Sequence, residues 1–297
     1  MKTFFTSFFF SFDVIFFKFK FEFFNMPELP EVETIRIALS NKLLKCKILK
    51  VFLKSKKLRF LIPYNIKKVE KSYIKKINRK GKYLIFEINS GSKLLMHLGM
   101  TGFFKIQNKY IIEKHDHLIF KFEDFFLTYN DVRRFGFIKY YSDNEYLKSK
   151  HIIKLGEDPL LTNFNEKYII EKIKRKNQNI KNFIMNQENI AGLGNIYCSE
   201  ILFDSNISPL RNANKIKMKE ITKLVISTKK ILTKAIKFGG TSLKDFKNPD
   251  GKLGYFKNRL KVYDRENQSC YKCKDKGSIK KIYISGRSTF FCNNCQK

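Results

Sequence analysis

The sequence has no tryptophan, few acidic residues and no long uncharged apolar run. No stretch reaches the roughly 18 uncharged apolar residues that a transmembrane helix needs, so we expect no membrane span. Asp and Glu number 27 against 60 Lys and Arg, which leaves +33 over 297 residues. Such a charge attracts polyanions and argues against acidic-protein or purely small-molecule partners. The absence of Trp beside abundant Lys, Asn, Ile, Phe and Tyr also resembles an AT-rich coding bias. Charge alone therefore does not establish nucleic-acid binding.

The six cysteines are not spread through the chain as a disulfide framework would require. Four form two C-x-x-C pairs, Cys270 with Cys273 and Cys292 with Cys295, with residues 274–291 between them. This spacing predicts one tetrahedral Zn²⁺ site, and four thiolate ligands leave no open position for catalysis. So short a segment cannot bury a core unaided, so the metal would supply its folding energy. We expect a structural zinc ion in a reducing compartment.

Residues 1–25 differ in composition from everything that follows, because they contain twelve phenylalanines. Three origins are open for them. The segment is an upstream extension from a mis-assigned start before Met26, a removable targeting segment, or a genuine folded element. We expect that they are not part of the active protein.

Residues 26–155 have the pattern of an antiparallel β domain headed by one helix. In the helix, predicted over 31–44, Val32, Ile35, Leu39 and Leu43 recur at helical spacing after Pro30. Short β-branched and aromatic runs, separated by turn residues, follow at 47–53, 82–88, 118–122 and 137–141.

Beyond a change of composition at 155–159 the patterns become helical. The clearest helix is predicted over 218–237, and Gly239 and Gly240 end it. We expect a helical domain over 156–262 and the zinc finger over 263–297. The predicted fold class is therefore multidomain α+β.

A second motif, PELPEVE at 27–33, directly follows Met26. Removal of that methionine would expose the secondary amine of Pro27, and a terminal amine with a pKa of about 7.7–8.0 is partly neutral at pH 7. Such an amine can attack a sugar carbon and form a Schiff base, with Glu28 beside it to move protons. The same carboxylates could merely complement a helix N-terminus. Chemistry alone leaves both interpretations open.

PELPEVE together with the four-cysteine segment resembles the formamidopyrimidine-DNA glycosylase family, bacterial enzymes of 8-oxoguanine repair. The resemblance extends over 26–297 through motifs in the family's order. These are RKGKY at 79–83, HLGMTG at 97–102, HDH at 115–117, RRFG at 133–136, AGLGNIY at 191–197, GGTSLKDF at 239–246, DGKLGYF at 250–256 and RSTFFCNNC at 287–295.

The resemblance implies a catalytic role for several residues. Pro27, once N-terminal, would be the nucleophile at C1′ of the damaged nucleotide. Glu28 would be the acid/base partner that opens the deoxyribose, with Glu31 as a supporting carboxylate. Lys82 would grip a phosphate and assist β-elimination, and Arg287 would bind phosphate and serve δ-elimination.

The resemblance also implies how DNA is held. The damaged base must leave the stack, and Met100, Arg133 and Phe135 match the family's void-filling trio. It further implies a helix-two-turn-helix unit around 191–195 and an N-terminal β-sandwich. The remaining expected DNA contacts are His97, His115, Lys176, Lys181, Asn195, Lys244 and Tyr255.

Three positions depart from the family's pattern. Val132 replaces a proline before RRFG, which predicts a looser turn. Leu253 replaces a proline in the loop that covers the flipped base, and Asn177 replaces a commonly basic residue. None of these touches the chemistry, whereas residues 1–25 would, because they turn the Pro27 nitrogen into an amide.

Three functions compete. The first is a glycosylase and abasic-site lyase for oxidised purines. The second is an endonuclease VIII-like glycosylase for oxidised pyrimidines, which PELPEV and the long 239–256 loop disfavour. The third is a non-catalytic zinc-finger DNA-binding protein, if Pro27 is never freed. The expected partner is duplex DNA with oxidised bases or abasic sites, bound by a monomer in the cytoplasm. Organellar import is the alternative if residues 1–25 are a targeting segment.

Overall fold

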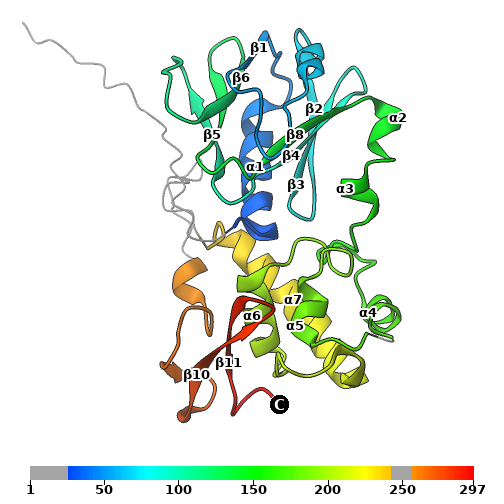
Figure 1. Ribbon diagram of the computed structural model, residues 1–297, viewed down its shortest axis with the longest axis vertical. Coiled ribbons are helices and arrows are strands. Elements are labelled where there is room, and N and C mark those ends of the chain that lie inside the picture. Colours follow the sequence, from blue (N-terminus) through cyan, green and yellow to red (C-terminus); the bar gives the residue numbers. More distant parts are fainter. Residues whose placement is uncertain (1–25, 175, 242–255) are drawn as a thin grey trace, which may run out of the picture.

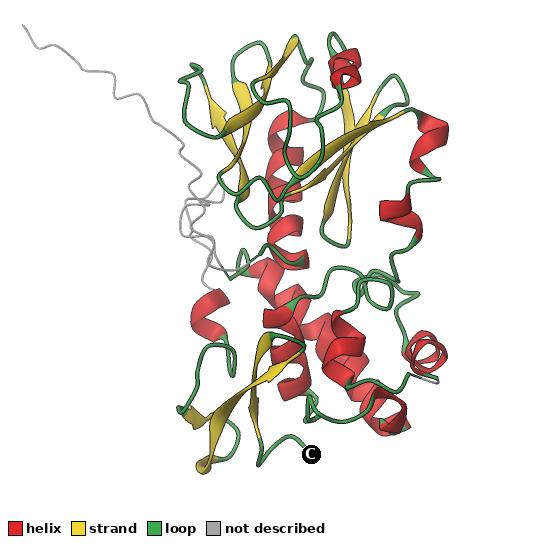
Figure 2. Ribbon diagram, viewed as in Figure 1, coloured by secondary structure: helices red, strands yellow, loops and turns green. Residues whose placement is uncertain are grey.

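A computed structural model describes residues 26–174, 176–241 and 256–297. Two lobes lie one above the other in Figure 1. The upper one contains α1 and two β-sheets, and the lower one contains helices and a β-hairpin. Figure 2 shows that strands dominate the upper lobe and helices the lower one. The predicted α+β class is confirmed.

The upper lobe, here called the sandwich lobe, is built from two four-stranded sheets with antiparallel pairing throughout. One has the order β1-β6-β7-β5 and the other β2-β3-β4-β8. Their bounds are β1 Lys50–Leu53, β2 Ile74–Lys80, β3 Tyr83–Ile88, β4 Lys93–His97, β5 Gly102–Gln107, β6 Asp116–Lys121, β7 Phe126–Asp131 and β8 Phe137–Tyr141. The predicted runs at 47–53, 82–88 and 137–141 contain β1, β3 and β8, and the run at 118–122 overlaps β6.

Helix α1, Leu29–Leu43, lies along this core, and Val32, Ile35, Leu39 and Leu43 are all buried in it. The helical spacing of these residues produces one continuous apolar face, as predicted. A 3₁₀ helix over Tyr64–Val69 and the short helices α2, Asp143–Tyr146, and α3, Lys150–Ile153, complete the lobe.

The helical lobe contains α4 Glu166–Ile173, α5 Ile180–Met185, α6 Asn195–Asp204 and α7 Met218–Lys237, with a 3₁₀ turn at Ala213–Lys215. The predicted helix over 218–237 matches α7. Two turns, around 187–189 and 191–192, separate α5 from α6, which is the helix-two-turn-helix arrangement. Leu29 of α1 packs into the core of this lobe, so the start of α1 joins the two lobes.

The C-terminal finger consists of β9 Ser269–Cys270, β10 Lys274–Ile284 and β11 Arg287–Cys292, preceded by a 3₁₀ turn at Phe256–Arg259. β10 and β11 form an antiparallel hairpin. Ile279, Phe290 and Cys292 of the hairpin are buried in the same core as the helices. Among the described residues, no helix combines the length and apolarity that crossing a bilayer requires.

Candidate active site and metal site

The Glu28 carboxylate lies at the boundary of the two lobes, bound to the N-terminus of α6. It accepts hydrogen bonds from the backbone N–H of Gly194 at 2.7 Å, Ile196 at 2.9 Å and Tyr197 at 3.4 Å. A Cβ at position 194 would lie 2.3 Å from the Glu28 Cδ, so glycine permits this approach. Glu28 is only 3% exposed, although its partners lie more than 160 positions along the chain.

The protonation of Glu28 follows from this burial. Desolvation raises the pKa of its carboxyl to about 7, and the nearby Glu31 charge adds to the rise, while Lys82 and the backbone N–H groups oppose it. A carboxyl with a pKa near 7 exists in both protonation states at neutral pH. It can therefore act as a general acid or a general base.

Glu31 holds the first turn of α1 in place. Its carboxylate accepts from the Glu28 N–H at 3.0 Å and from the Tyr197 hydroxyl at 2.7 Å. It also accepts from the N–H of Thr241 at 2.8 Å and its hydroxyl at 3.0 Å. Glu31 thus ties α1 to α6 and to the chain after α7. Pro27, which directly precedes Glu28, is buried at the same place.

Lys82 reaches the lobe boundary from the tip of the β2–β3 hairpin. Its neighbour Gly81 has a left-handed φ of 56°, and a Cβ there would lie 3.3 Å from the Ala191 Cβ, so the tip rests on the turn before α6. Lys82 is only 9% exposed. Burial lowers the pKa of its amine, whereas the Glu28 charge raises it. Lys82 and Glu28 therefore lie close enough to influence each other's protonation.

Arg79, which the sequence analysis did not single out, anchors the β2–β3 hairpin. Its guanidinium binds Glu33 of α1 at 2.8 Å and Asp158, in the connection between the lobes, at 2.5 Å. It also donates to the Gly81 carbonyl at 3.0 Å. The only sequence signal was its place in RKGKY, because its partners lie 46 and 79 positions away.

The finger places Arg287, exposed at the start of β11, beside the helix-two-turn-helix unit. The Ser288 carbonyl accepts from Lys181 Nζ at 3.1 Å and from Asn195 Nδ2 at 2.9 Å. Lys181 Nζ also donates to the Thr289 hydroxyl at 2.6 Å. Lys181 is completely buried, and burial lowers its pKa to about 8. These two nitrogens hold the finger, and their contact with phosphate stays a prediction.

The three predicted void-filling residues lie on two neighbouring turns. Met100 is half-buried between β4 and β5, while Arg133 and Phe135 are exposed between β7 and β8. The Arg133 guanidinium lies 4.7 Å from the Phe135 ring centroid. A Cβ at Gly99 would lie 2.4 Å from the Gly136 nitrogen, so the turns touch.

Buried Asp131 joins these two turns. Its carboxylate accepts from the Thr101 hydroxyl at 2.5 Å and the Gly136 N–H at 2.8 Å. The Arg133 N–H donates to the Thr101 hydroxyl at 3.0 Å. These hydrogen bonds hold the turn in which Val132 stands where the family has proline. The looser turn expected from Val132 stays a prediction.

The two predicted histidine contacts differ in environment. His97 Nδ1 accepts from the Gly99 N–H at 3.0 Å, and its ring stacks on Phe137 at 5.6 Å. Burial first, and then the nearby Lys82, Arg59 and His151, lower the pKa of His97 to about 3. His97 is therefore neutral at pH 7. His115 has a left-handed φ of 71°, and its carbonyl accepts from the Asp131 N–H at 3.2 Å, beside the void-filling turns.

The other predicted DNA contacts are less informative. Lys176 is exposed after α4. Lys244, Tyr255 and the departure at Leu253 lie outside the described residues. Asn177, where a basic residue was expected, is also exposed, and its side chain accepts a hydrogen bond from Asn212 at 3.0 Å.

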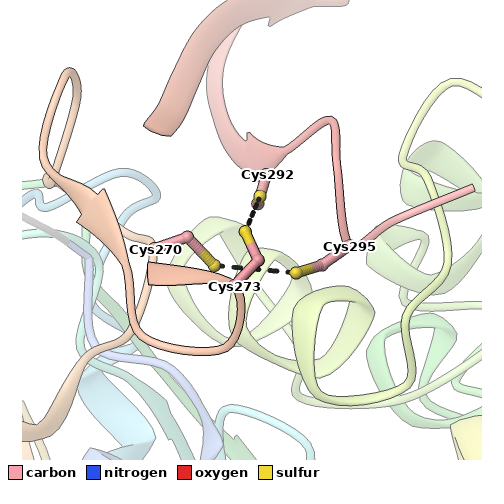
Figure 3. Close-up of side chains that lie close together, drawn as sticks. All are labelled: Cys270, Cys273, Cys292 and Cys295. Carbon is pink, nitrogen blue, oxygen red and sulfur yellow. Dashed lines mark hydrogen bonds between the residues drawn. The ribbon is translucent and has the colours of Figure 1, made fainter. Parts of the chain in front are cut away.

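The four finger cysteines converge on one point, as Figure 3 shows. Their Sγ atoms all lie within 4.8 Å of one another. The Cys270–Cys295 and Cys273–Cys292 sulfurs are 3.8 and 3.6 Å apart. A zinc–sulfur bond of about 2.3 Å gives a tetrahedron with edges of roughly 3.8 Å. The sulfurs therefore fit a single Zn²⁺ held by four thiolates, as predicted.

A further carboxylate, that of Glu200, attaches the finger's preceding segment to α6. It accepts from the backbone N–H groups of Lys261, Val262 and Tyr263, each at 2.9 Å. No sequence pattern marked Glu200, because its partners are backbone groups some 60 positions away. Glu28 thus binds N–H groups at the start of α6, whereas Glu200 projects from α6 and binds N–H groups of the segment before the finger.

A β-sandwich, a helix-two-turn-helix unit and a four-cysteine finger that meet around buried carboxylates and lysines define a class of DNA-repair glycosylase. Family models agree: the formamidopyrimidine-DNA glycosylase N-terminal domain matches residues 26–138, and the H2TH domain of the same family matches residues 155–247. The chain belongs to the formamidopyrimidine-DNA glycosylase family.

Individual relatives are similar over nearly their whole length. The chain is 43% identical over 274 residues to formamidopyrimidine-DNA glycosylase from Rickettsia africae, which covers 91% of this chain and 99% of the relative. The Legionella pneumophila enzyme is 41% identical, with 91% and 98% covered. A Lactococcus lactis mutant enzyme, solved in complex with DNA that contains Fapy-dG, superposes with a TM-score of 0.84 at 37% identity. That match covers 91% of this chain and 100% of the other.

Proposed function

We propose that this chain is a base-excision repair enzyme that removes oxidised purines, 8-oxoguanine and formamidopyrimidines, from duplex DNA and then cuts the abasic site. One observation carries the proposal. The carboxyl of Glu28, held at the N-terminus of α6 beside Pro27 and Lys82, has a pKa raised to about 7. The Lactococcus lactis relative solved with Fapy-dG DNA supports the substrate class.

In the glycosylase step, the damaged nucleotide leaves the stack so that its sugar reaches the Pro27 nitrogen. The secondary amine attacks C1′, and the bond from C1′ to the base breaks, so the base departs with a proton. Glu28 supplies a proton to the sugar ring oxygen as the deoxyribose opens. The product is an iminium, or Schiff base, between Pro27 and C1′.

In the lyase step, the iminium makes the C2′ proton acidic. Its removal expels the 3′ phosphate by β-elimination, and a second elimination expels the 5′ phosphate. Lys82 grips a phosphate and assists the first elimination, and Arg287 binds phosphate during the second. Deprotonated Glu28 is one base available at the reacting sugar, because its pKa lies near neutral pH.

The vacated space in the duplex would be filled by Met100, Arg133 and Phe135. An apolar wedge and a stacked ring replace the lost base, while the Arg133 guanidinium can hydrogen-bond the orphaned partner base. The zinc ion, held by Cys270, Cys273, Cys292 and Cys295, would supply structural rigidity to the hairpin that carries Arg287. We expect the enzyme to act as a monomer in the cytoplasm.

The active form begins at Pro27 in this proposal, either by initiation at Met26 or by later cleavage. Residues 1–25 would otherwise leave the Pro27 nitrogen as an amide, which cannot form an iminium. In that case the chain would be a non-catalytic zinc-finger DNA-binding protein. An endonuclease VIII-like preference for oxidised pyrimidines is the third possibility. Assays on duplexes with an oxidised pyrimidine and with 8-oxoguanine distinguish it from a purine-specific enzyme.

Borohydride trapping on duplex DNA with 8-oxoguanine tests the proposal. Protein initiated at Met26 should give a covalent adduct and β,δ-elimination products, while Pro27→Gly should slow both. The same protein with residues 1–25 verified intact by mass should bind DNA without an adduct. Efficient trapping by that full-length chain would remove Pro27 as the nucleophile and point to Lys82. Faster cutting of oxidised pyrimidines than of 8-oxoguanine would favour the endonuclease VIII-like function.

A further inference from the structure

A group of basic and aromatic side chains flanks His97 next to the β7–β8 turn that carries Arg133 and Phe135. We call it the cationic flank and define it as Arg59, Phe60, Lys139 and His151. Arg59 and Phe60 lie in the loop between β1 and the 3₁₀ helix Tyr64–Val69. The Arg59 N–H donates to the Gly136 carbonyl at 3.1 Å, so this loop is fastened to the β7–β8 turn.

Aromatic rings connect the cationic flank to His97. The Phe137 ring stacks on His97 with the ring centroids 5.6 Å apart. Its centroid also lies 4.8 Å from that of His151 and 5.3 Å from that of Phe60, which it meets edge-on. Phe60 and His151 lie 6.1 Å apart. These contacts fix where the four side chains of the flank lie relative to His97.

The cations of the flank stand over this aromatic surface. The Arg59 guanidinium lies 5.7 Å from the Phe60 ring centroid, and Lys139 Nζ lies 5.3 Å from it. The ring is 39% exposed. An aromatic face orients a cation without neutralising its charge. Exposed Arg59 and half-buried Lys139 therefore place two cationic side chains around this ring.

The flank lacks compensating carboxylates. Over residues 26–174, 176–241 and 256–297, neither Arg59 nor Lys139 forms an ion pair with Asp or Glu. Burial lowers the pKa of His151, and the Lys139 and Arg59 charges lower it further. His151 is thus a neutral hydrogen-bonding group beside two unpaired cations. Such an arrangement attracts an anion.

We propose that the cationic flank binds a backbone phosphate of the DNA adjacent to the phosphate that His97 is predicted to contact, with Arg59 as its principal ligand. The planar guanidinium suits phosphate because it donates two parallel hydrogen bonds. Lys139 adds a point charge. The flank would extend the contacts of Lys82 and His97 along the DNA, past the lesion. This inference rests on the proposed function only for the kind of partner, because it concerns binding and not chemistry.

The salt dependence of binding tests Arg59 directly. The full 297-residue chain can be used with an undamaged duplex and with a duplex carrying a tetrahydrofuran abasic analogue, because binding does not need the Pro27 amine. Each neutralised phosphate contributes a slope of about −0.9 to log K against log salt. Arg59→Gln should make the slope shallower by about that amount on both duplexes. The ratio of wild-type to Arg59→Gln affinity should therefore fall about 3.5-fold when the salt concentration rises fourfold.

Two variants serve as controls. Arg59→Lys keeps the charge and should keep the slope. Lys223→Gln removes the same charge from an exposed position in the second turn of α7. That position is roughly 20 Å from the end of α7 that approaches Glu31, at 1.5 Å per residue. Lys223→Gln should therefore leave the slope unchanged. Thermal unfolding should show that Arg59→Gln, Arg59→Lys and Lys223→Gln are all folded.

Neutral methylphosphonate linkages locate the phosphate. Substituted one at a time along either strand, one linkage should weaken the wild-type chain several-fold and leave Arg59→Gln unaffected. That non-additivity assigns the contact. Additive losses at every linkage, or an unchanged slope in Arg59→Gln, would overturn the inference. Failure of the Met26-initiated enzyme to trap DNA would instead overturn the proposed function and leave these binding results standing.

Discussion

The lobe boundary and the finger both supply ionisable groups to the proposed DNA site, but they hold them in opposite ways. At the boundary, Glu28 and Lys82 are 3% and 9% exposed, and burial shifts the pKa of both. On the finger, Arg287 is exposed at the start of β11. An arginine stays protonated in any environment, so it needs no burial to keep its charge.

The difference separates two tasks. Proton transfer requires a pKa near the working pH, which for the Glu28 carboxyl comes from desolvation in a buried site. Phosphate binding requires a fixed charge in the right place, which an exposed hairpin can present. The boundary is fixed by protein contacts from α1, α6 and the β2–β3 hairpin. The finger depends on four sulfurs, a few anchoring side chains and a small number of residues buried against the helices. The two regions should therefore fail differently.

The largest expected effect concerns the boundary. Glu28→Gln removes the titrating proton but keeps the shape of the side chain, so the carboxyl's hydrogen bonds to α6 are only partly lost. Excision of 8-oxoguanine should fall about 1000-fold, within the usual range for loss of a general acid or base. Single-turnover kinetics of the Met26-initiated enzyme measures this.

Cutting at a preformed abasic site gives the control for Glu28→Gln. It should fall much less, because the base has already gone. Duplex affinity should stay within about threefold of the wild type. Equal losses on both substrates, together with a loss of duplex affinity well beyond threefold, would show that Glu28 serves the boundary's structure and not proton transfer.

Disrupting the finger should weaken DNA binding and leave the sandwich lobe folded. Chelation of zinc, or Cys273→Ser, removes the tetrahedral thiolate set, and the hairpin then cannot hold Arg287. Affinity for abasic duplex should fall about 100-fold, measured by fluorescence anisotropy. The β signal in circular dichroism should persist, because the core of the sandwich lobe contains no finger residue. An unchanged affinity after verified loss of zinc would contradict the structural role of the metal.

The sequence predicted the elements whose signals are local. The apolar spacing in α1, the C-x-x-C pairs and the helix over 218–237 each lie within one short stretch, and each is confirmed. It did not reveal Arg79, Asp131 or Glu200, because their partners are distant in sequence or are backbone N–H groups. The resemblance implied an acid/base role for Glu28, but its burial against α6 was equally hidden, since its partners lie more than 160 positions away. Pairings of that kind come from tertiary structure alone.

Lys181 sharpens the comparison, because it belongs to the helical lobe but holds the finger. Lys181→Ala removes two hydrogen bonds to Ser288 and Thr289 and leaves the Asn195 bond in place. We expect abasic-duplex affinity to fall about tenfold. If the role is to position the finger, the salt slope should stay constant. A slope shallower by about 0.9 would instead show direct phosphate contact.

The smallest effect should come from His97, whose charge the boundary suppresses. A lowered pKa of about 3 means that the ring is neutral both in mildly acidic and in neutral solution. It can then donate one hydrogen bond to phosphate but contributes no cation. His97→Gln, which keeps a donor, should change abasic-duplex affinity by no more than about threefold and leave the salt slope unaltered. Wild type and variant should also show the same change in affinity between pH 5.5 and 7.5, measured by anisotropy at constant ionic strength. Were His97 an ordinary surface histidine with a pKa near 6.5, the wild type alone would bind more tightly as the pH fell. The sign follows because protonation would add a positive charge facing a phosphate. A wild-type-specific gain at pH 5.5 would therefore show that burial does not suppress ionisation at the edge of the boundary, and the contrast with the exposed finger would not extend to His97.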